Sequence, residues 1–344
     1  MRFRWIVLTL AFWLLAALAL GCITAAPPSP TATPVPPTPT LVPPTSTPTP
    51  IAITPTAEPT AVPAAFPLTI TDSLGREVTI TTLPRRLVSL APSNTEILFA
   101  VGAGDRIVGV TEYCNYPPEA KEGREIVGGF SAKSLSVEKI LSLQPDVVFS
   151  AGAIHQPVIE ALEQAGVTVV ALDAQSFDEV YQNILTAGRI TGHIAEAEKV
   201  VAEMKDRLAK VQAIVGQIPE QERPRVFYEV WDEPLMTAGP DTFIGQMIEL
   251  AGGINVFADV KEQYPQISPE AVVERNPDVI LGPDSHAEGL TAEKIAARPG
   301  WGDIKAVRDG RILIVNGDIV SRPGPRIVEA VETIARLLYP ERFP

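Results

Sequence analysis

The feature that most limits the fold of this chain is a regular alternation of short apolar segments with amphipathic ones, from about residue 87 to residue 338. The apolar segments have the length and β-branched composition of buried strands, and the others repeat apolar residues every three to four positions, as helices do. We expect strands at 87–90, 107–110, 147–150, 168–172, 226–230, 279–281 and 312–315, and helices at 94–101, 137–143, 157–165, 243–250, 269–275 and 326–338. Such alternation favours mostly parallel sheets flanked by helices.

One long helical segment interrupts this alternation. Apolar residues recur at helical spacing over 195–215, and Pro219 and Pro224 end the segment before the alternation starts again. Before the first of these strands, apolar residues alternate with polar ones on both sides of a turn at Ser73-Leu74-Gly75. This pattern predicts a β-hairpin over 68–80. We therefore predict an α/β fold of two lobes with mostly parallel sheets, joined by one long rigid helix and preceded by a small hairpin.

An internal repeat supports two similar lobes. Residues 136–149 match residues 268–281 at a constant offset (268 − 136 = 132). In each copy a serine stands where a helix N-cap is expected, and Glu138 or Glu270 falls in the first turn. A carboxylate there is stabilised by the helix dipole by about 0.3–1 kcal/mol, so capping alone accounts for each glutamate without a partner.

The first residues have the order of an export signal. Arg2 and Arg4 precede an apolar run over 5–20, which stops at Gly21-Cys22. A transmembrane anchor is the alternative, but the run is short for a span of about 20 residues and lacks a basic flank. A small residue before a cysteine resembles the lipobox of bacterial lipoproteins, which implies cleavage after residue 21 and acylation of Cys22.

A Pro/Thr-rich segment follows over 22–66, and it lacks the apolar residues that a core requires. Proline-rich sequence favours an extended spacer of about 3.1 Å per residue, so this disordered tether can hold a domain on the order of 100 Å from a bilayer. The predicted organisation is therefore a lipoprotein signal peptide over 1–21, the tether over 22–66, an N-terminal lobe over 67–190, the linking helix over 191–222 and a C-terminal lobe over 223–344.

Charge and composition exclude several functions. The net charge of −13 and the pI near 4.8 disfavour nucleic acid as a partner. With Cys22 assigned to lipidation, Cys114 is a lone thiol and no intramolecular disulfide is expected. Three histidines are too few and too scattered for a metal site built on imidazole. We expect a monomer with no intrinsic cofactor.

Several short motifs carry a resemblance that covers residues 84–343. They are Pro92-Ser93-Asn94-Thr95-Glu96, Tyr116-Pro117-Pro118-Glu119, the two repeat segments, Tyr264-Pro265-Gln266, and Asp318 followed by Arg322 and Pro325-Arg326. Together they resemble the helical-backbone (class III) substrate-binding lipoproteins of ABC importers, and most closely the cobalamin (vitamin B12) binders of the siderophore, haem and cobalamin group.

The resemblance implies a location, a ligand and a partner. The protein would stand outside the cytoplasm, anchored to the cell membrane through Cys22, and capture cobalamin between two Rossmann-like lobes for delivery to the permease. A ferric siderophore or haem is the alternative ligand. In this family a glutamate from each lobe docks into arginine pockets of the transmembrane subunits, and Glu138 and Glu270 match those positions.

Most of the predicted ligand-binding residues follow strands, because open parallel sheets bind ligands beyond the carboxyl ends of their strands. Phe130 and Tyr264 lie instead in the loops before Glu138 and Glu270, and the resemblance to the cobalamin binders implies a cleft position for Tyr264. They are Tyr113, Phe130, Trp231, Tyr264, Asp318 and Arg322. Flat aromatics suit the apolar face of a corrin, and polar groups suit its amides. The alternatives are that Tyr113 or Phe130 is core and that Asp318 with Arg322 is a surface ion pair. One departure is Ala151, where the cobalamin binders have a tryptophan.

Three other interpretations stay open. His155 and His286 occupy nearly equivalent loops of the two lobes and are candidate ligands of a metal-centred macrocycle. Glu229, Asp232 and Glu233 are candidate acid and base groups of an enzyme, although no nucleophile or metal-ligand pattern accompanies them. A binding protein that serves a sensor without transport is the third interpretation.

Overall fold

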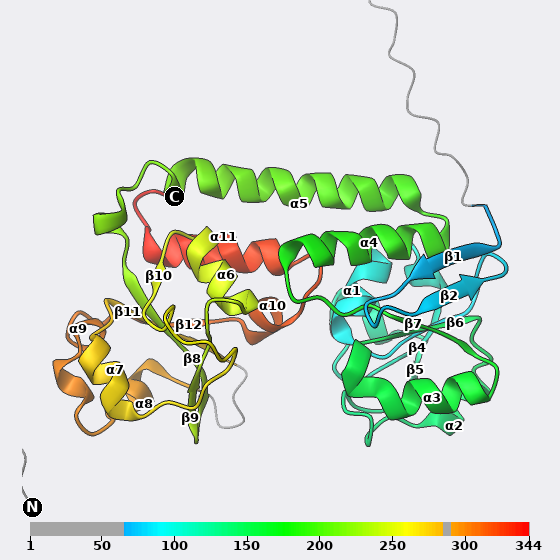
Figure 1. The fold of residues 1–344 in the computed structure, drawn as a ribbon, viewed down its shortest axis with the longest axis horizontal. Coiled ribbons are helices and arrows are strands. Elements are labelled where there is room, and N and C mark those ends of the chain that lie inside the picture. The colour runs from blue at the N-terminus through cyan, green and yellow to red at the C-terminus, as the bar shows by residue number, and fades with distance from the viewer. Residues whose placement is uncertain (1–64, 285–289, 344) are drawn as a thin grey trace, which may run out of the picture. The chain divides into compact units, whose positions relative to one another are not determined.

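The computed structural model describes residues 65–284 and 290–343, which include two sheets with helices on both faces (Figure 1). The chain divides into two compact units between Ala57 and Glu58, and every described residue belongs to the second. The sheet of the first lobe has the parallel order β5-β4-β3-β6-β7. Its strands are β3 (Leu87–Ser89), β4 (Ile107–Val110), β5 (Glu125–Ile126), β6 (Val147–Ser150) and β7 (Thr168–Ala171), and its helices are α1 (Pro92–Ala100), α2 (Val137–Ser142) and α3 (Gln156–Gln164).

The second lobe repeats this plan with the parallel order β10-β8-β11-β12, and β9 pairs antiparallel with β8. Its strands are β8 (Arg225–Asp232), β9 (Leu235–Thr237), β10 (Ile254–Asn255), β11 (Val279–Pro283) and β12 (Ile312–Val315). Its helices are α6 (Phe243–Leu250), α7 (Pro269–Arg275), α8 (Ala292–Ala296), α9 (Lys305–Arg308), α10 (Gly317–Ser321) and α11 (Ile327–Leu338).

Both faces of each sheet are covered, which explains why the central strands are continuously apolar rather than alternating. In β6, Val147 and Phe149 belong to a core shared with α1 and α4 (Phe177–Thr191), whereas Val148 faces α2 and α3. In β8, Val226 faces that same shared core and Phe227 packs instead with Trp301. Successive side chains of a strand point to opposite faces, so each strand supplies two cores.

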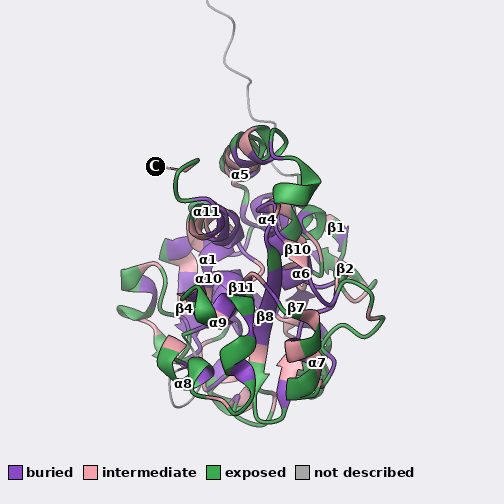
Figure 2. Ribbon diagram, turned by 90° about the vertical axis from the view of Figure 1, so that its left-hand side faces the viewer, coloured by how far each residue is buried: buried purple, intermediate pink, exposed green. Residues whose placement is uncertain are grey.

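The lobes are linked by a layer of helices rather than by a single rod. Helix α5 (Ile194–Val215) lies along α4 and α11 (Figure 1), and one apolar core continues from the first lobe through α5 into the second. Arg207 of α5 makes two hydrogen bonds to Glu332 of α11, at 2.8 and 2.7 Å. Figure 2 shows α11 and β8 largely buried and the outer side of α5 exposed. A packed layer of this kind resists wide hinge motion between the lobes.

The hairpin of β1 (Leu68–Thr71) and β2 (Glu77–Ile80) is fixed to the first lobe by Asp72, whose side chain is fully buried. Its carboxylate accepts hydrogen bonds from the backbone N–H of Leu74 at the turn, from the Arg76 guanidinium, and from Ala171 N–H of β7. A buried carboxylate is tolerated because these donors satisfy it.

The predicted fold class is confirmed. The predicted bounds of β4, β6, β12, α6 and α7 agree with the structure, and those of the other predicted elements differ by no more than two residues at either end. The prediction omitted α4, α8, α9 and α10 and the short strands β5, β9 and β10. Cys22, the signal peptide and all but the last two residues of the predicted tether lie outside the described residues, and within the described part no helix has the length and apolar character needed to cross a membrane.

Candidate functional site

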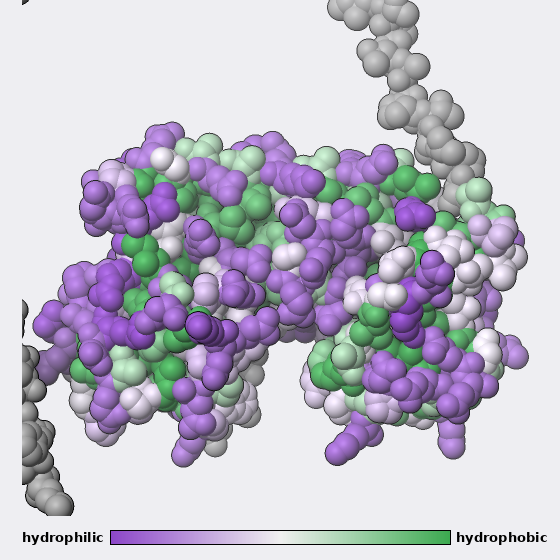
Figure 3. Space-filling view, in the orientation of Figure 1, coloured by the Kyte–Doolittle hydropathy of each residue, from purple (hydrophilic) through white to green (hydrophobic). Residues whose placement is uncertain are grey.

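A cavity of about 1090 Å³ lies between the two lobes. The first lobe lines it with residues that follow each of its five strands, and the second lobe with the start of α6, Tyr264, and residues within and directly after α10. Figure 3 shows the hollow between the lobes on the side away from α5. The cavity therefore lies at the carboxyl ends of the parallel strands of the first lobe, where open α/β sheets bind ligands.

Five of the six predicted ligand-binding residues line this cavity: Tyr113, Phe130, Tyr264, Asp318 and Arg322. Tyr113 is 53% exposed and Phe130 is 38% exposed, so the alternative that they are core residues is wrong. Trp231 is the last residue but one of β8, its indole N–H donates to the Glu233 carbonyl at 2.9 Å, and it is not among the cavity-lining residues. The ligand contact predicted for Trp231 therefore stays a prediction, and the set of cavity-lining residues does not support it.

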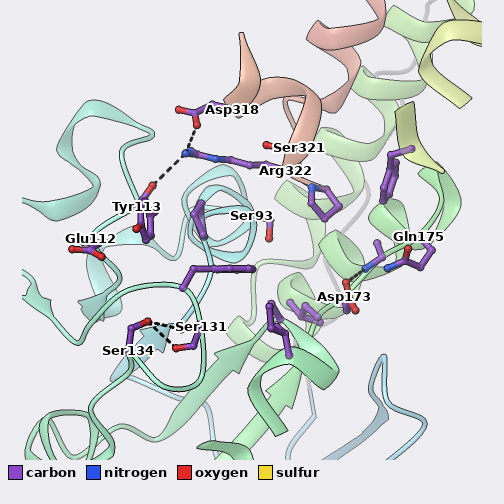
Figure 4. A pocket seen from close by; sticks show the side chains of 18 of the residues that line it. Ser93, Glu112, Tyr113, Ser131, Ser134, Asp173, Gln175, Asp318, Ser321 and Arg322 are labelled. Atoms are coloured by element: carbon purple, nitrogen blue, oxygen red, sulfur yellow. Dashed lines mark hydrogen bonds and ion pairs between the residues drawn. The ribbon is translucent and has the colours of Figure 1, made fainter. Parts of the chain in front are cut away.

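Arg322 is held by residues of both lobes. Its guanidinium donates to Asp318 at 2.5 Å and to the Tyr113 carbonyl at 3.3 Å (Figure 4). It also donates to the Asn115 side-chain oxygen at 2.6 Å. The Asn115 amide also donates to Asp318 at 2.8 Å. The Arg322 side chain is only 11% exposed, so its pair with Asp318 is part of a network and not the isolated surface ion pair of the alternative.

Glu96 of α1 lies behind Arg322 and completes this network. Its side chain is 2% exposed and accepts hydrogen bonds from Arg326 at 2.9 and 2.7 Å and from Arg322 at 3.2 Å. The Arg326 guanidinium also stacks on the Tyr116 ring at 3.9 Å from its centroid. The residues of three separate sequence motifs thus meet as an interlobe network of Glu96, Asn115, Tyr116, Asp318, Arg322 and Arg326.

His155 does not face a ligand, which corrects the interpretation of it as a macrocycle ligand. The residue is fully buried, its Nδ1 accepts from Ala151 N–H at 3.1 Å, and its Nε2–H donates to the Phe130 carbonyl at 2.7 Å. Both ring nitrogens are therefore occupied in the neutral imidazole. His286 lies outside the described residues. In the described part of the chain, no group of three or more His, Cys, Asp or Glu is placed to hold a metal ion.

Burial lowers the pKa of His155, against a smaller opposing effect of its hydrogen bond to Phe130. The unfolded chain then takes up a proton near pH 6.5 that the native protein binds only at lower pH, so stability is complete above pH 6.5 and falls as the pH drops below it. We expect acidification from pH 7.5 to 5.5 to lower the melting temperature of the native protein by roughly 2 °C more than that of His155→Gln.

Thermal melts of both proteins at the two pH values measure this difference, and His193→Gln, which removes an imidazole away from the cavity, is the control. An equal response of the native protein and His155→Gln to pH would contradict the assignment of a neutral, structural His155.

Two cavity residues that the sequence prediction omitted are Glu112 and Asp173. Asp173 lies two residues after the end of β7 and is half-buried, and burial raises the pKa of its carboxyl, with a further contribution from the charge of Glu179. On the second lobe, burial raises the pKa of the Tyr264 phenol. Asp173 comes directly after the predicted strand 168–172, and this position was the available sequence signal for it.

The acid and base groups proposed for an enzyme do not form a pair at the cavity. The Glu229 side chain is fully buried and accepts two hydrogen bonds from Arg298, at 2.6 and 2.7 Å. Asp232 and Glu233 follow at the end of β8 and do not line the cavity. Glu229 therefore stabilises the interior of the second lobe, and the interpretation that assigns it a catalytic role is wrong.

Glu138 and Glu270 occupy equivalent exposed positions in the first turns of α2 and α7. In each helix the preceding serine caps the N-terminus: Ser136 accepts from Lys139 N–H, and Ser268 from Ala271 N–H. Among the described residues no lysine or arginine forms an ion pair with either glutamate. Figure 1 shows α2 and α7 on different lobes and both on the side away from α5.

Comparisons with known proteins agree with this architecture. Residues 87–318 match the periplasmic binding protein family. An uncharacterized ABC transporter substrate-binding lipoprotein, YvrC, of Bacillus subtilis is 39% identical over 283 residues, 81% of this chain and 87% of that protein. A cobalamin-binding protein of Halobacterium salinarum is 35% identical over 286 residues, 80% of this chain and 75% of that protein.

Among solved structures, the periplasmic haem-binding protein RhuT of Roseiflexus sp. RS-1 is similar, with a TM-score of 0.68 and 29% identity over 75% of this chain and 99% of that one. The sequence match, the two lobes and the cavity between them agree with one another, and with the class that the sequence motifs predict. The chain therefore belongs to the periplasmic binding protein family, a family of solute-binding proteins.

Proposed function

We propose that this protein captures cobalamin in the cavity between its lobes and delivers it to the permease of an ABC importer. The observation that carries the proposal is the form of the cavity: a volume of about 1090 Å³ with Tyr113 and Phe130 on one lobe and Tyr264 on the other. This volume lies at the upper end of the usual range for ligand pockets and therefore suits a large macrocycle. The aromatic side chains suit the flat face of such a ligand.

The polar groups of the cavity favour cobalamin over haem. Haem carries two propionates, and the one cationic side chain among the described lining residues, Arg322, is already paired with Asp318 and Glu96. The described residues also offer no favourable axial ligand for haem iron. His155 is buried, and the raised pKa of Tyr264 disfavours the phenolate form that would bind iron. The amides of a corrin need neither a cation nor a phenolate.

Delivery requires a tether and a docking surface. Acylation of Cys22 and the Pro/Thr-rich segment would hold the protein at the outer face of the membrane, and Glu138 and Glu270 would contact the two permease subunits. The support for docking is that each lobe exposes one unpaired carboxylate at an equivalent helix start. Carboxylates at two separated points fix orientation as well as contact.

Titration of the purified protein with cyanocobalamin, haemin or a ferric hydroxamate siderophore tests the ligand, followed by the tryptophan fluorescence and by the visible spectrum of the ligand. We expect cyanocobalamin to bind, and Tyr264→Ala combined with Arg322→Ala to weaken its binding by roughly 100-fold, because an aromatic contact is lost and the interlobe network that positions the cavity wall is broken.

Arg308→Ala is the matched control, because it removes an exposed cation of the second lobe, on α9, that does not line the cavity. The affinity of this variant for cyanocobalamin should stay near that of the native protein. Tight binding of haemin or of the siderophore, with no binding of cyanocobalamin, would refute the ligand assignment and leave the family unchanged.

A further inference from the structure

The charges around the cavity are not balanced. Four charged side chains line it in the described part of the chain: Glu112, Asp173, Asp318 and Arg322. Arg322 and Asp318 belong to the interlobe network, in which the two cations Arg322 and Arg326 balance the two carboxylates of Glu96 and Asp318. The negative charges of Glu112 and Asp173 are not balanced in this way, because no described lysine, arginine or histidine forms an ion pair with either of them.

These two carboxylates stand on different parts of the wall. Glu112 follows β4, next to Tyr113, whereas Asp173 follows β7, and Figure 4 shows them on opposite sides of the view. Asp173 is held in place because its carboxylate accepts from Ala174 N–H at 3.0 Å and packs against Gly152. A side chain at Gly152 would approach the Asp173 carboxylate to 2.9 Å, and the φ of +69° at that position also favours glycine.

We infer that Glu112 and Asp173 are specificity-determining residues of the cavity, which exclude solutes that present carboxylates and favour neutral solutes that present amide N–H groups. The inference rests on the proposed function, since it concerns the ligand of that same cavity. The peripheral amides of a corrin donate hydrogen bonds that carboxylates accept. A solute carboxylate would meet like charge with no free cation to compensate, and such juxtaposition is strongly unfavourable where water is displaced.

A pair of probes that differ in a single charge tests the inference. Cyanocobalamin and its isomeric monocarboxylic acids share the same corrin, and in each acid one peripheral amide is replaced by a carboxylate. We expect the native protein to bind at least one of the acids about tenfold more weakly than cyanocobalamin, and added salt to reduce the difference because it screens exposed charges.

The combined variant Glu112→Gln and Asp173→Asn should reduce the difference between acid and amide probes to about twofold, because both carboxylates are then neutral amides. The control is Glu198→Gln with Glu203→Gln on exposed positions of α5, which changes the net charge of the protein equally and should keep the tenfold difference. Glu112→Gln alone should give a ratio of amide to acid affinity between those of the native protein and the combined variant. Because Glu112 is exposed, this single variant still tests the inference if Asp173→Asn impairs folding.

Equal affinity of the native protein for cyanocobalamin and all of its acids would overturn the inference and leave cobalamin capture intact. A preference for cyanocobalamin that persists unchanged in the combined variant would overturn it as well. Failure of cyanocobalamin to bind the native protein would refute the proposed function and the inference together.

Discussion

Replacing Glu138 and Glu270 together by alanine is expected to abolish ligand uptake through the importer and to leave ligand affinity unchanged. Both carboxylates are exposed at helix starts and lie outside the cavity lining, so their loss would remove the proposed contacts to the permease without disturbing the site. A hydrogen bond to a charged group contributes about 1.5–3 kcal/mol, and losing one such contact on each lobe weakens docking by a factor of roughly 10² to 10⁴.

Two measurements test this expectation: ligand uptake into cells or proteoliposomes that contain the importer, and the dissociation constant of the purified variant. Glu198→Ala with Glu203→Ala on α5 is the control, since it removes the same charge from the side away from α2 and α7 and should retain uptake. Normal uptake by the Glu138 and Glu270 variant would refute the docking role, and a loss of ligand affinity would show that these residues act on the cavity instead.

The repeat that points to Glu138 and Glu270 also shows how much of the fold can be predicted locally. Strands such as β6 are continuously apolar and bounded by turns, and helices such as α7 carry their own cap and stop, so sequence patterns are sufficient for them. The strands β5 and β10 are two residues long, too short for any periodicity, and exist because they pair with β4 and β8. Tertiary contacts define them.

The omission of α4 has a different cause. Its segment does repeat apolar residues at helical spacing, with Ser176 as N-cap and Gly192 in the left-handed conformation at its end, so the signal was present in the sequence. The sequence prediction has a single helix between the lobes, whereas the structure has a packed layer of α4, α5 and α11. The stiffness of that link is therefore a property of packing and not of helix length alone.

The candidate site also has parts that local sequence patterns predict and parts that only tertiary contacts define. Aromatic residues after strands could be placed near one another because the carboxyl ends of parallel strands share an edge. The partners of Arg322 could not, since Glu96 and Asn115 are more than 200 residues away along the chain and meet it only after the lobes pack. Both residues lie within or beside motifs that resemble the family, but a motif does not state which charges will pair.

Replacing Glu96 by alanine is expected to destabilise the protein by about 3 kcal/mol. The Glu96 side chain is 2% exposed and is the shared partner of Arg322 and Arg326 from the other lobe. Alanine would leave two largely buried guanidinium groups without this counter-charge, and of the two Arg322 alone keeps a second ion pair among the described residues, with Asp318. An uncompensated buried charge costs more than the pair contributes.

Chemical denaturation monitored by circular dichroism measures the change in the free energy of unfolding, and Glu332→Ala supplies the matched control. Glu332 makes the same two-bond pair with Arg207 between α11 and α5, but at 23% exposure, so its loss should cost about 1 kcal/mol or less. Because Arg322 also lines the cavity, Glu96→Ala should weaken ligand binding and Glu332→Ala should not. If both variants were equally stable and bound the ligand equally well, the interlobe network would hold neither the lobes nor the site, and the position of Arg322 would have to be set by Asp318 and Asn115 alone.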